Sequence, residues 1–240
     1  MSRVIFVASG KGGVGKSVFS ANLGATFADK GLSVALVDMN IGLRNLDLYL
    51  GLESKVVFDS ADVISGVVPL KRALVRDKRL QALYFLSTTQ RKEKFAATEE
   101  QVARLYAQLA GMHDIVIIDG PAGVTQELRL ASSGVSKAVI VTTPEHVSLR
   151  DADMMDQTLR SRGVMKRAYV VNKANKAFMG DGILPSFETI TTLMKLPLIG
   201  VIQQDDAIHL SANKGYPIVL QRGNYIERNF SKISDRILSL

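Results

Sequence analysis

The residues best suited to chemistry lie near the start of the chain, where residues 10–17 read GKGGVGKS. This spacing, G-x-x-x-x-G-K-S, is that of a phosphate-binding loop. Glycines permit a tight turn whose N–H groups point inward at phosphate oxygens, and a helix that begins at the end of the loop adds its positive dipole end. Lys16 supplies a positive charge for the β- and γ-phosphates, and the Ser17 hydroxyl can ligate Mg²⁺. The pattern therefore predicts a site for a nucleoside triphosphate and Mg²⁺.

The elements that must hold this loop flank it directly. Residues 3–9 are a short run of β-branched and aromatic side chains, typical of a buried strand. Residues 18–29 carry Leu23 and Phe27 four positions apart, which indicates a helix that starts near Gly15 and ends near Lys30. The loop thus has the strand–loop–helix context that its motif requires. The alternative is a glycine-rich turn that binds nothing.

A second lysine, Lys11, stands near the other end of the loop. The resulting K-G-G-V-G-K resembles the deviant Walker A motif of the MinD/ParA family of ATPases. The resemblance implies that Lys11 reaches across an ATP-sandwiched homodimer to the partner's nucleotide. A solvated surface lysine is the alternative. By the same resemblance, ATP is bound by the following residues: Gly10, Lys11, Gly12, Gly13, Val14, Gly15, Lys16, Ser17, Val18 and Asn172.

A second motif follows a predicted strand over residues 33–38 that ends in Asp38. Residues 39–48 read MNIGLRNLDL and are similar to the switch I sequence of MinD-like members, D-x-D-I-G-L-R-N-L-D. In the family the second aspartate sits near the γ-phosphate and is assigned to the attacking water, but this chain has Asn40 there. The resemblance assigns catalysis to Lys11, Lys16, Asn40 and Asp38, and the departure at Asn40 predicts slow hydrolysis. An ordinary strand-to-helix loop is the alternative.

Residues 114–119, DIVIID, predict a central strand that ends in Asp119. In P-loop proteins a carboxylate at this position holds the magnesium shell. Residues 120–123, GPAG, follow and are close to the D-x-P-A-G switch II of MinD-like proteins. The expected metal set is therefore Ser17 directly, with Asp119 and Asp38 acting through water.

Later motifs extend the resemblance. Residues 148–153, SLRDAD, resemble the family's S-x-R-D-x-D at the start of a helix, on a face used by protein partners. Acidic residues in a first helical turn are also routine partners of the helix dipole. The expected partner surface comprises Arg44, Asp47, Asp151 and Asp153.

The nucleobase end of the site is less regular in sequence. Asn172 follows a predicted strand over residues 168–171, and in the family an asparagine there can contact adenine. A polar strand cap is the alternative. After a predicted strand over residues 198–202, the family usually has Pro-Glu near the base. Here residues 203–206 read QQDD, so the base contacts are expected to differ in detail.

The remaining segments complete an alternation of strands and helices. Helical periodicity is present in residues 56–68 and 69–79, a short strand is predicted at 83–86, and a loop at 88–94. Residues 98–109 predict a helix with a capping box, residues 137–142 a strand, and residues 225–240 a helix with one apolar stripe. This order predicts an α/β fold, a three-layer αβα P-loop NTPase (Rossmann-like) with a mostly parallel twisted sheet, in one domain over residues 1–240. The nucleotide should lie at the carboxyl ends of the strands.

Composition limits the alternatives. The 240 residues include no cysteine, which excludes disulfides and thiolate metal sites, and no apolar stretch is long enough for a transmembrane helix. The three histidines are scattered without ligand spacing. A formal net charge of +7 suits nucleic acid or anionic lipid, or serves solubility alone.

The resemblance implies a Mg²⁺-dependent, dimerising switch ATPase that acts in bacterial division-site placement. MinC-like and MinE-like proteins and an anionic membrane surface are the implied partners, and nucleic acid is not expected. The implied location is cytoplasmic, and peripheral at the inner face of the cell membrane if the natural chain continues past Leu240. The last helix has the spacing of a core-facing helix, so we expect no membrane-targeting helix in this chain. Two alternatives stay open: a ParA-like or flagellum-number ATPase acting on DNA or other cargo, and an ATP-held scaffold that barely hydrolyses.

Overall fold

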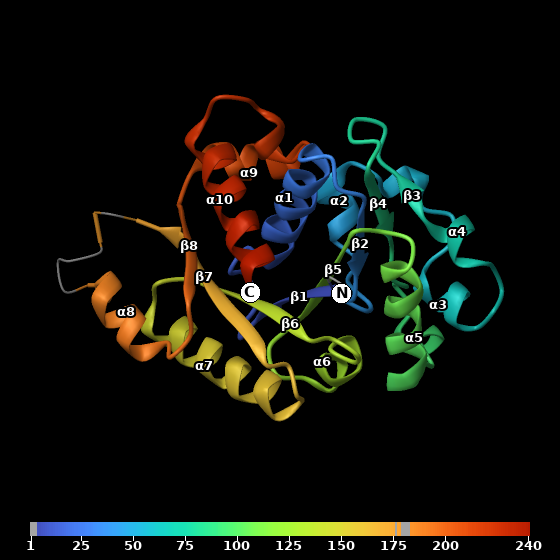
Figure 1. Ribbon diagram of the computed structural model, residues 1–240, viewed down its shortest axis with the longest axis horizontal. Coiled ribbons are helices and arrows are strands. Elements are labelled where there is room, and N and C mark those ends of the chain that lie inside the picture. The colour runs from blue at the N-terminus through green and yellow to red at the C-terminus, as the bar shows by residue number, and fades with distance from the viewer. Residues whose placement is uncertain (1–3, 176, 179–182) are drawn as a thin grey trace.

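The computed structural model describes residues 4–175, 177–178 and 183–240. Within these ranges, eight strands form one sheet in the order β3-β4-β2-β5-β1-β6-β7-β8 (Figure 1). Neighbouring strands are parallel except β3 and β4. The strands are β1 Val4–Ser9, β2 Val34–Asp38, β3 Val75–Arg76, β4 Leu83–Leu86, β5 Ile115–Ala122, β6 Lys137–Thr142, β7 Lys166–Ala174 and β8 Leu198–Gln203.

Helices cover both faces of the sheet, which makes three layers (Figure 1). One face packs against α1, α2 and α10, and the other against α4 to α8. The α-helices are α1 Lys16–Asp29, α2 Leu46–Leu50, α3 Ser60–Ile64, α4 Leu70–Ala73, α5 Glu99–Ala110, α6 Gln126–Ala131, α7 His146–Ser161, α8 Phe187–Leu193, α9 Asp206–Asn213 and α10 Tyr225–Ser239. Short 3₁₀ turns are η1 Glu53–Lys55, η2 Lys92–Lys94 and η3 Ile218–Leu220.

The central strands are apolar on both sides because each side has its own core. In β1, Phe6 and Ala8 belong to the core under α5 and α7, whereas Ile5 and Val7 belong to the core under α1 and α10. This division follows from the alternation of side chains along a strand. The predicted fold class is confirmed. No helix in the described part of the chain is long and apolar enough to cross a bilayer.

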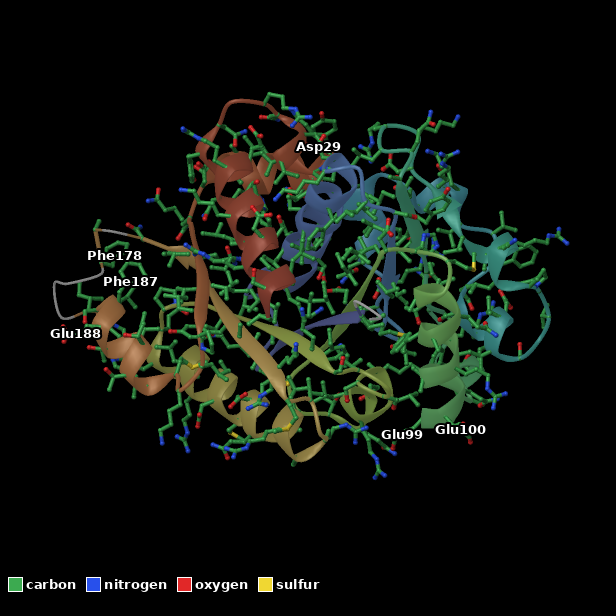
Figure 2. The ribbon with its side chains drawn as sticks, in the orientation of Figure 1. Asp29, Glu99, Glu100, Phe178, Phe187 and Glu188 are labelled. Atoms are coloured by element: carbon green, nitrogen blue, oxygen red, sulfur yellow. The ribbon has the colours of Figure 1, made fainter. Side chains whose placement is uncertain are left out.

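Local signals at helix ends behave as predicted. In α5 the Thr98 side chain accepts a hydrogen bond from the Gln101 N–H, and the Gln101 side chain accepts one from the Thr98 N–H. Figure 2 shows Glu99 and Glu100 in the first turn of this helix, where acidic side chains favour the helix dipole. The apolar stripe of α10 is buried over most of its length, at Ile226, Phe230, Ile233 and Ile237.

The two long helices predicted over residues 56–68 and 69–79 are wrong. The structure has only the short α3 and α4 there, followed by β3, which pairs antiparallel with β4. A capping box at Asp59 starts α3 late, and Gly66, with φ 78°, ends the helical path early. The predicted loop over residues 88–94 contains η2, and residue 3 of the first predicted strand lies outside the described residues.

Candidate functional site

A pocket of about 540 Å³ opens at the carboxyl ends of the central strands. The phosphate loop forms its floor, and segment 40–49, the end of β7 and helix α9 form its walls. Asn40, Tyr49, Asn172 and Lys173 are among the residues that line it. This is the edge of an α/β sheet where ligands bind, so the structure brings the predicted loop, Asn40 and Asn172 to one cavity.

The loop is a tight connection between β1 and α1. Gly13 and Gly15 have φ values of 81° and 89°, which side-chain-bearing residues adopt only with strain. Two other elements also approach its glycines closely. A Cβ on Gly15 would lie 2.4 Å from the Asn172 Nδ2, and a Cβ on Gly10 would lie 2.2 Å from the backbone carbonyl carbon of Asp151. Gly13 is therefore required by its conformation, Gly10 by packing, and Gly15 by both.

Asp119, at full burial, is the hub of the polar groups below the loop. Its carboxylate lies 2.8 Å from the Lys16 Nζ and accepts hydrogen bonds from the hydroxyls of Ser17 at 2.6 Å and Ser20 at 2.7 Å. The Asn40 Nδ2 donates a further bond at 2.8 Å. The phosphate-loop motif ends at Ser17 and therefore did not predict the contact of Ser20 with Asp119. The spacing of three residues could have indicated it, because it puts both hydroxyls on one face of α1.

Asp38 lies beside Asp119 because β2 and β5 pair in register at these two residues. Burial, and then the charge of Asp119, raises the pKa of Asp38 to about 6. Backbone N–H groups of Asn40 and Leu46 oppose this rise by donating to the carboxylate at 2.8 and 3.1 Å. The Asn40 Nδ2 also donates to Asp38 at 3.1 Å, so one amide group bridges the two acids.

The oxygen atoms of these side chains fit Mg²⁺ bound together with a nucleotide. The Ser17 hydroxyl and the carboxylates of Asp38 and Asp119 are hard oxygen ligands of the type that Mg²⁺ prefers. Within the described residues no cluster of three or more His, Cys, Asp or Glu side chains could hold a metal alone.

The other predicted site residues have different surroundings. Lys11 is half-buried, lines the pocket and makes no hydrogen bond or ion pair within the described residues. Asp151 and Asp153 lie half-buried on α7, and Asp153 accepts a hydrogen bond from Gln157 at 2.8 Å. They remain predictions as partner contacts.

The prediction that Asp47 belongs to the partner surface is wrong, because its side chain is only 2% exposed and cannot itself face a partner. Its carboxylate accepts hydrogen bonds from the Arg44 Nε at 2.6 Å and from the Leu48 N–H at 2.9 Å. The acid therefore ties Arg44 to the start of α2. Arg44, which has φ 48°, keeps part of its surface exposed.

Comparison with known proteins places this site in a family. A family model described as ParA, an NUBPL iron-transfer P-loop NTPase, matches residues 1–238. The chain belongs to the MinD/ParA family of P-loop NTPases. The septum site-determining protein MinD of Synechocystis sp. is 42% identical over 221 residues, which cover 92% of this chain and 83% of that protein. The MinD of Bacillus subtilis is 38% identical over 240 residues, covering 99% and 90%.

Solved structures of family members give the same result. The MinD of a MinC:MinD cell division complex from Aquifex aeolicus matches with a TM-score of 0.91 and 34% identity, over 99% of this chain and 96% of that one. A MinD from Pyrococcus horikoshii, complexed with Mg-ADP, matches with a TM-score of 0.89 and 27% identity, over 99% and 96%. The predicted family is confirmed. The prediction of a MinD-like NTPase of division-site placement is confirmed as well.

Proposed function

We propose that this chain is an ATP-dependent dimerising switch whose slow hydrolysis of ATP releases the dimer. The observation that carries the proposal is the arrangement of Lys16 and Ser17 around Asp119, at the edge of a pocket that Lys11 also lines. Lys11 has no hydrogen-bond or ion-pair partner among the described residues, so its ammonium is available to a nucleotide on a second copy. The similarity to a MinD complexed with Mg-ADP supports the choice of ligand.

The chemistry follows from the groups around the loop. Backbone N–H groups hold the β-phosphate, and Lys16 exchanges its bond with Asp119 for one with the β- and γ-phosphates. Bound Mg²⁺, held by Ser17 and through water by Asp38 and Asp119, would supply positive charge to the same phosphates. Water attacks the γ-phosphorus as the bond to the β–γ bridging oxygen breaks, and the proton that the water loses passes to a γ-phosphoryl oxygen and then to solvent. The products are ADP and inorganic phosphate.

Asn40 sets the predicted rate. Its side-chain carbonyl can accept a hydrogen bond from the attacking water and orient it, but an amide does not take up the proton at neutral pH. General-base help is typically worth about 10²–10⁴-fold. We therefore expect positioning and charge stabilisation to operate without it, so that turnover is slow and the dimer is long-lived.

The proposed partners follow the family. The relative from Aquifex aeolicus was solved as a MinC:MinD complex, which supports a MinC-like partner for this chain. A MinE-like partner and an anionic surface at the inner face of the cell membrane rest on the family resemblance. Arg44, Asp151 and Asp153 are the proposed partner contacts. We also infer that residues 1–240 form one domain, because both cores lie against one sheet.

Two alternatives each have one feature in their favour. The net charge of +7 suits a relative that acts on DNA, and salt-sensitive binding of random DNA by the ATP-bound protein would favour it. Asn40 suits an ATP-held scaffold, which a single-turnover assay would reveal by the absence of cleavage. The similarity to MinD proteins over most of the chain favours the division-site switch.

Light scattering with and without Mg-ATP tests the proposal. Lys16→Ala should abolish tight ATP binding, whereas Lys11→Ala should bind ATP as a monomer and fail to dimerise. Lys195→Ala changes an exposed lysine outside the pocket and is the matched control. An ATP-dependent dimer that survives Lys11→Ala would exclude the cross-dimer role.

A further inference from the structure

The end of β7 reaches across the pocket to the phosphate loop. The Asn172 Nδ2 donates a hydrogen bond to the Val14 carbonyl oxygen at 2.8 Å. The neighbouring Lys173 Nζ donates one to the Gly13 carbonyl oxygen at 2.7 Å. Two adjacent side chains thus bind two adjacent carbonyls of the loop, and we refer to Asn172 and Lys173 together as the strap.

The strap depends on an uncommon backbone conformation. Lys173 has φ 54°, in the left-handed region that non-glycine residues seldom adopt. Consecutive side chains of a regular strand point to opposite faces, so an extended backbone could not turn both Asn172 and Lys173 toward the loop. The pairing of β7 with β8 is also irregular between Val171 and Ala174. The left-handed residue is therefore what allows both contacts.

The phosphate loop needs donors on its outer side. When its N–H groups face a phosphate, several of its carbonyls point away from the ligand, and each then requires a donor. Gly13 and Gly15 adopt the necessary positive φ values readily, but glycine does not hold any one conformation by itself. Gly15 also packs directly against the Asn172 amide. The strap thus restrains the phosphate loop, whose glycines otherwise allow many backbone conformations.

We propose that Lys173, together with Asn172, is a positioning residue that holds the loop in its phosphate-binding shape. It acts through the loop backbone and needs no contact with the reacting atoms. The inference rests on the proposed function, because it requires that the loop bind a nucleotide. The inference predicts that the strap strengthens binding of any polyphosphate, whether or not a nucleoside is attached to it.

The test is calorimetric titration with Mg-ADP and with Mg²⁺ and inorganic tripolyphosphate. Lys173→Met keeps the aliphatic stem and removes the donor, and it should weaken binding of both ligands by roughly three- to tenfold. Lys173→Arg keeps a donor on a long side chain and should restore most of the affinity. Lys195→Met, outside the pocket, should bind both ligands as the native protein does.

Lys173→Gly separates positioning from simple structural support. Glycine adopts φ 54° with little strain, so resistance to unfolding should hold or rise while affinity for both ligands falls as in Lys173→Met. Native affinity in both Lys173→Met and Lys173→Gly would overturn the inference. Weakened binding of ADP alone would also overturn it, because Lys173 would then contact the nucleoside. If the native protein bound neither ligand, the proposed function itself would be wrong.

Discussion

Asn40→Asp tests how the two buried acids of the site are held in the nucleotide-free protein. The Asn40 Nδ2 donates hydrogen bonds to Asp119 at 2.8 Å and to Asp38 at 3.1 Å. The substitution removes both bonds and places a third carboxylate beside the pair. By the switch I resemblance an aspartate at this position is assigned to the attacking water, so the effects of the substitution on stability and on catalysis should be opposite.

The expected loss of stability can be worked from these contacts. A hydrogen bond to a charged group contributes about 1.5–3 kcal/mol, so losing two costs at most about 6 kcal/mol. Asn40 is only half-buried, and a new carboxylate can turn toward water, which relieves much of the repulsion. We therefore expect the free energy of unfolding of the nucleotide-free protein to fall by about 2–4 kcal/mol. With Mg-ATP bound the loss should be smaller, because a third carboxylate is favourable beside a divalent cation.

Denaturant unfolding with and without Mg-ATP measures the first effect, and Asn40→Ala serves as the control that removes the donor without adding charge. Single-turnover cleavage in a preformed dimer measures the second, and Asn40→Asp should accelerate it with little change in ATP affinity. Equal stability of Asn40→Asp and the native protein without nucleotide would refute the bridging role of the amide. An unchanged rate of cleavage would refute the catalytic role assigned to this position.

Three further predictions concern other parts of the molecule. The Arg162 guanidinium, which donates a hydrogen bond to Glu99, lowers the pKa of this acid to about 2. Thermal melts should therefore show a lower Tm for Glu99→Gln than for the native protein at pH 7. This difference in Tm should disappear as the pH falls from 4.5 to 2, because Glu99 then becomes protonated in the folded protein as well. Gly15→Ala would place a Cβ 2.4 Å from the Asn172 side chain and should reduce the affinity for ATP, measured by titration, more than tenfold. Gly31 has a similar positive φ but lies in open space, so Gly31→Ala should leave the ATP affinity unchanged. The apolar stripe of α10 is buried, so this chain should co-sediment weakly with anionic vesicles even with ATP; strong binding would show that the stripe is available to lipid.

Much of the site could be predicted from the sequence because its parts are local or topologically simple. Spacing alone identifies the phosphate loop, since the loop, its lysine and its hydroxyl are consecutive in the chain. Asp38 and Asp119 each follow an apolar run that predicts a strand, and the carboxyl ends of parallel strands meet at one edge of a sheet. Asn40, two residues after Asp38, was assigned to the site by the resemblance of residues 39–48 to a family switch sequence.

Only the tertiary structure decided how these groups are paired. No sequence pattern shows that Asp47 turns inward to Arg44, because an acidic residue near a helix start suits a surface equally well. The long helix predicted over residues 69–79 was wrong because the pairing of β3 with β4 overrides helical periodicity there. The bonds from Asn172 and Lys173 to the loop span more than 150 residues and depend on one left-handed backbone angle. Neither these contacts nor that angle is encoded in a local motif, because both arise when β7 packs beside the loop.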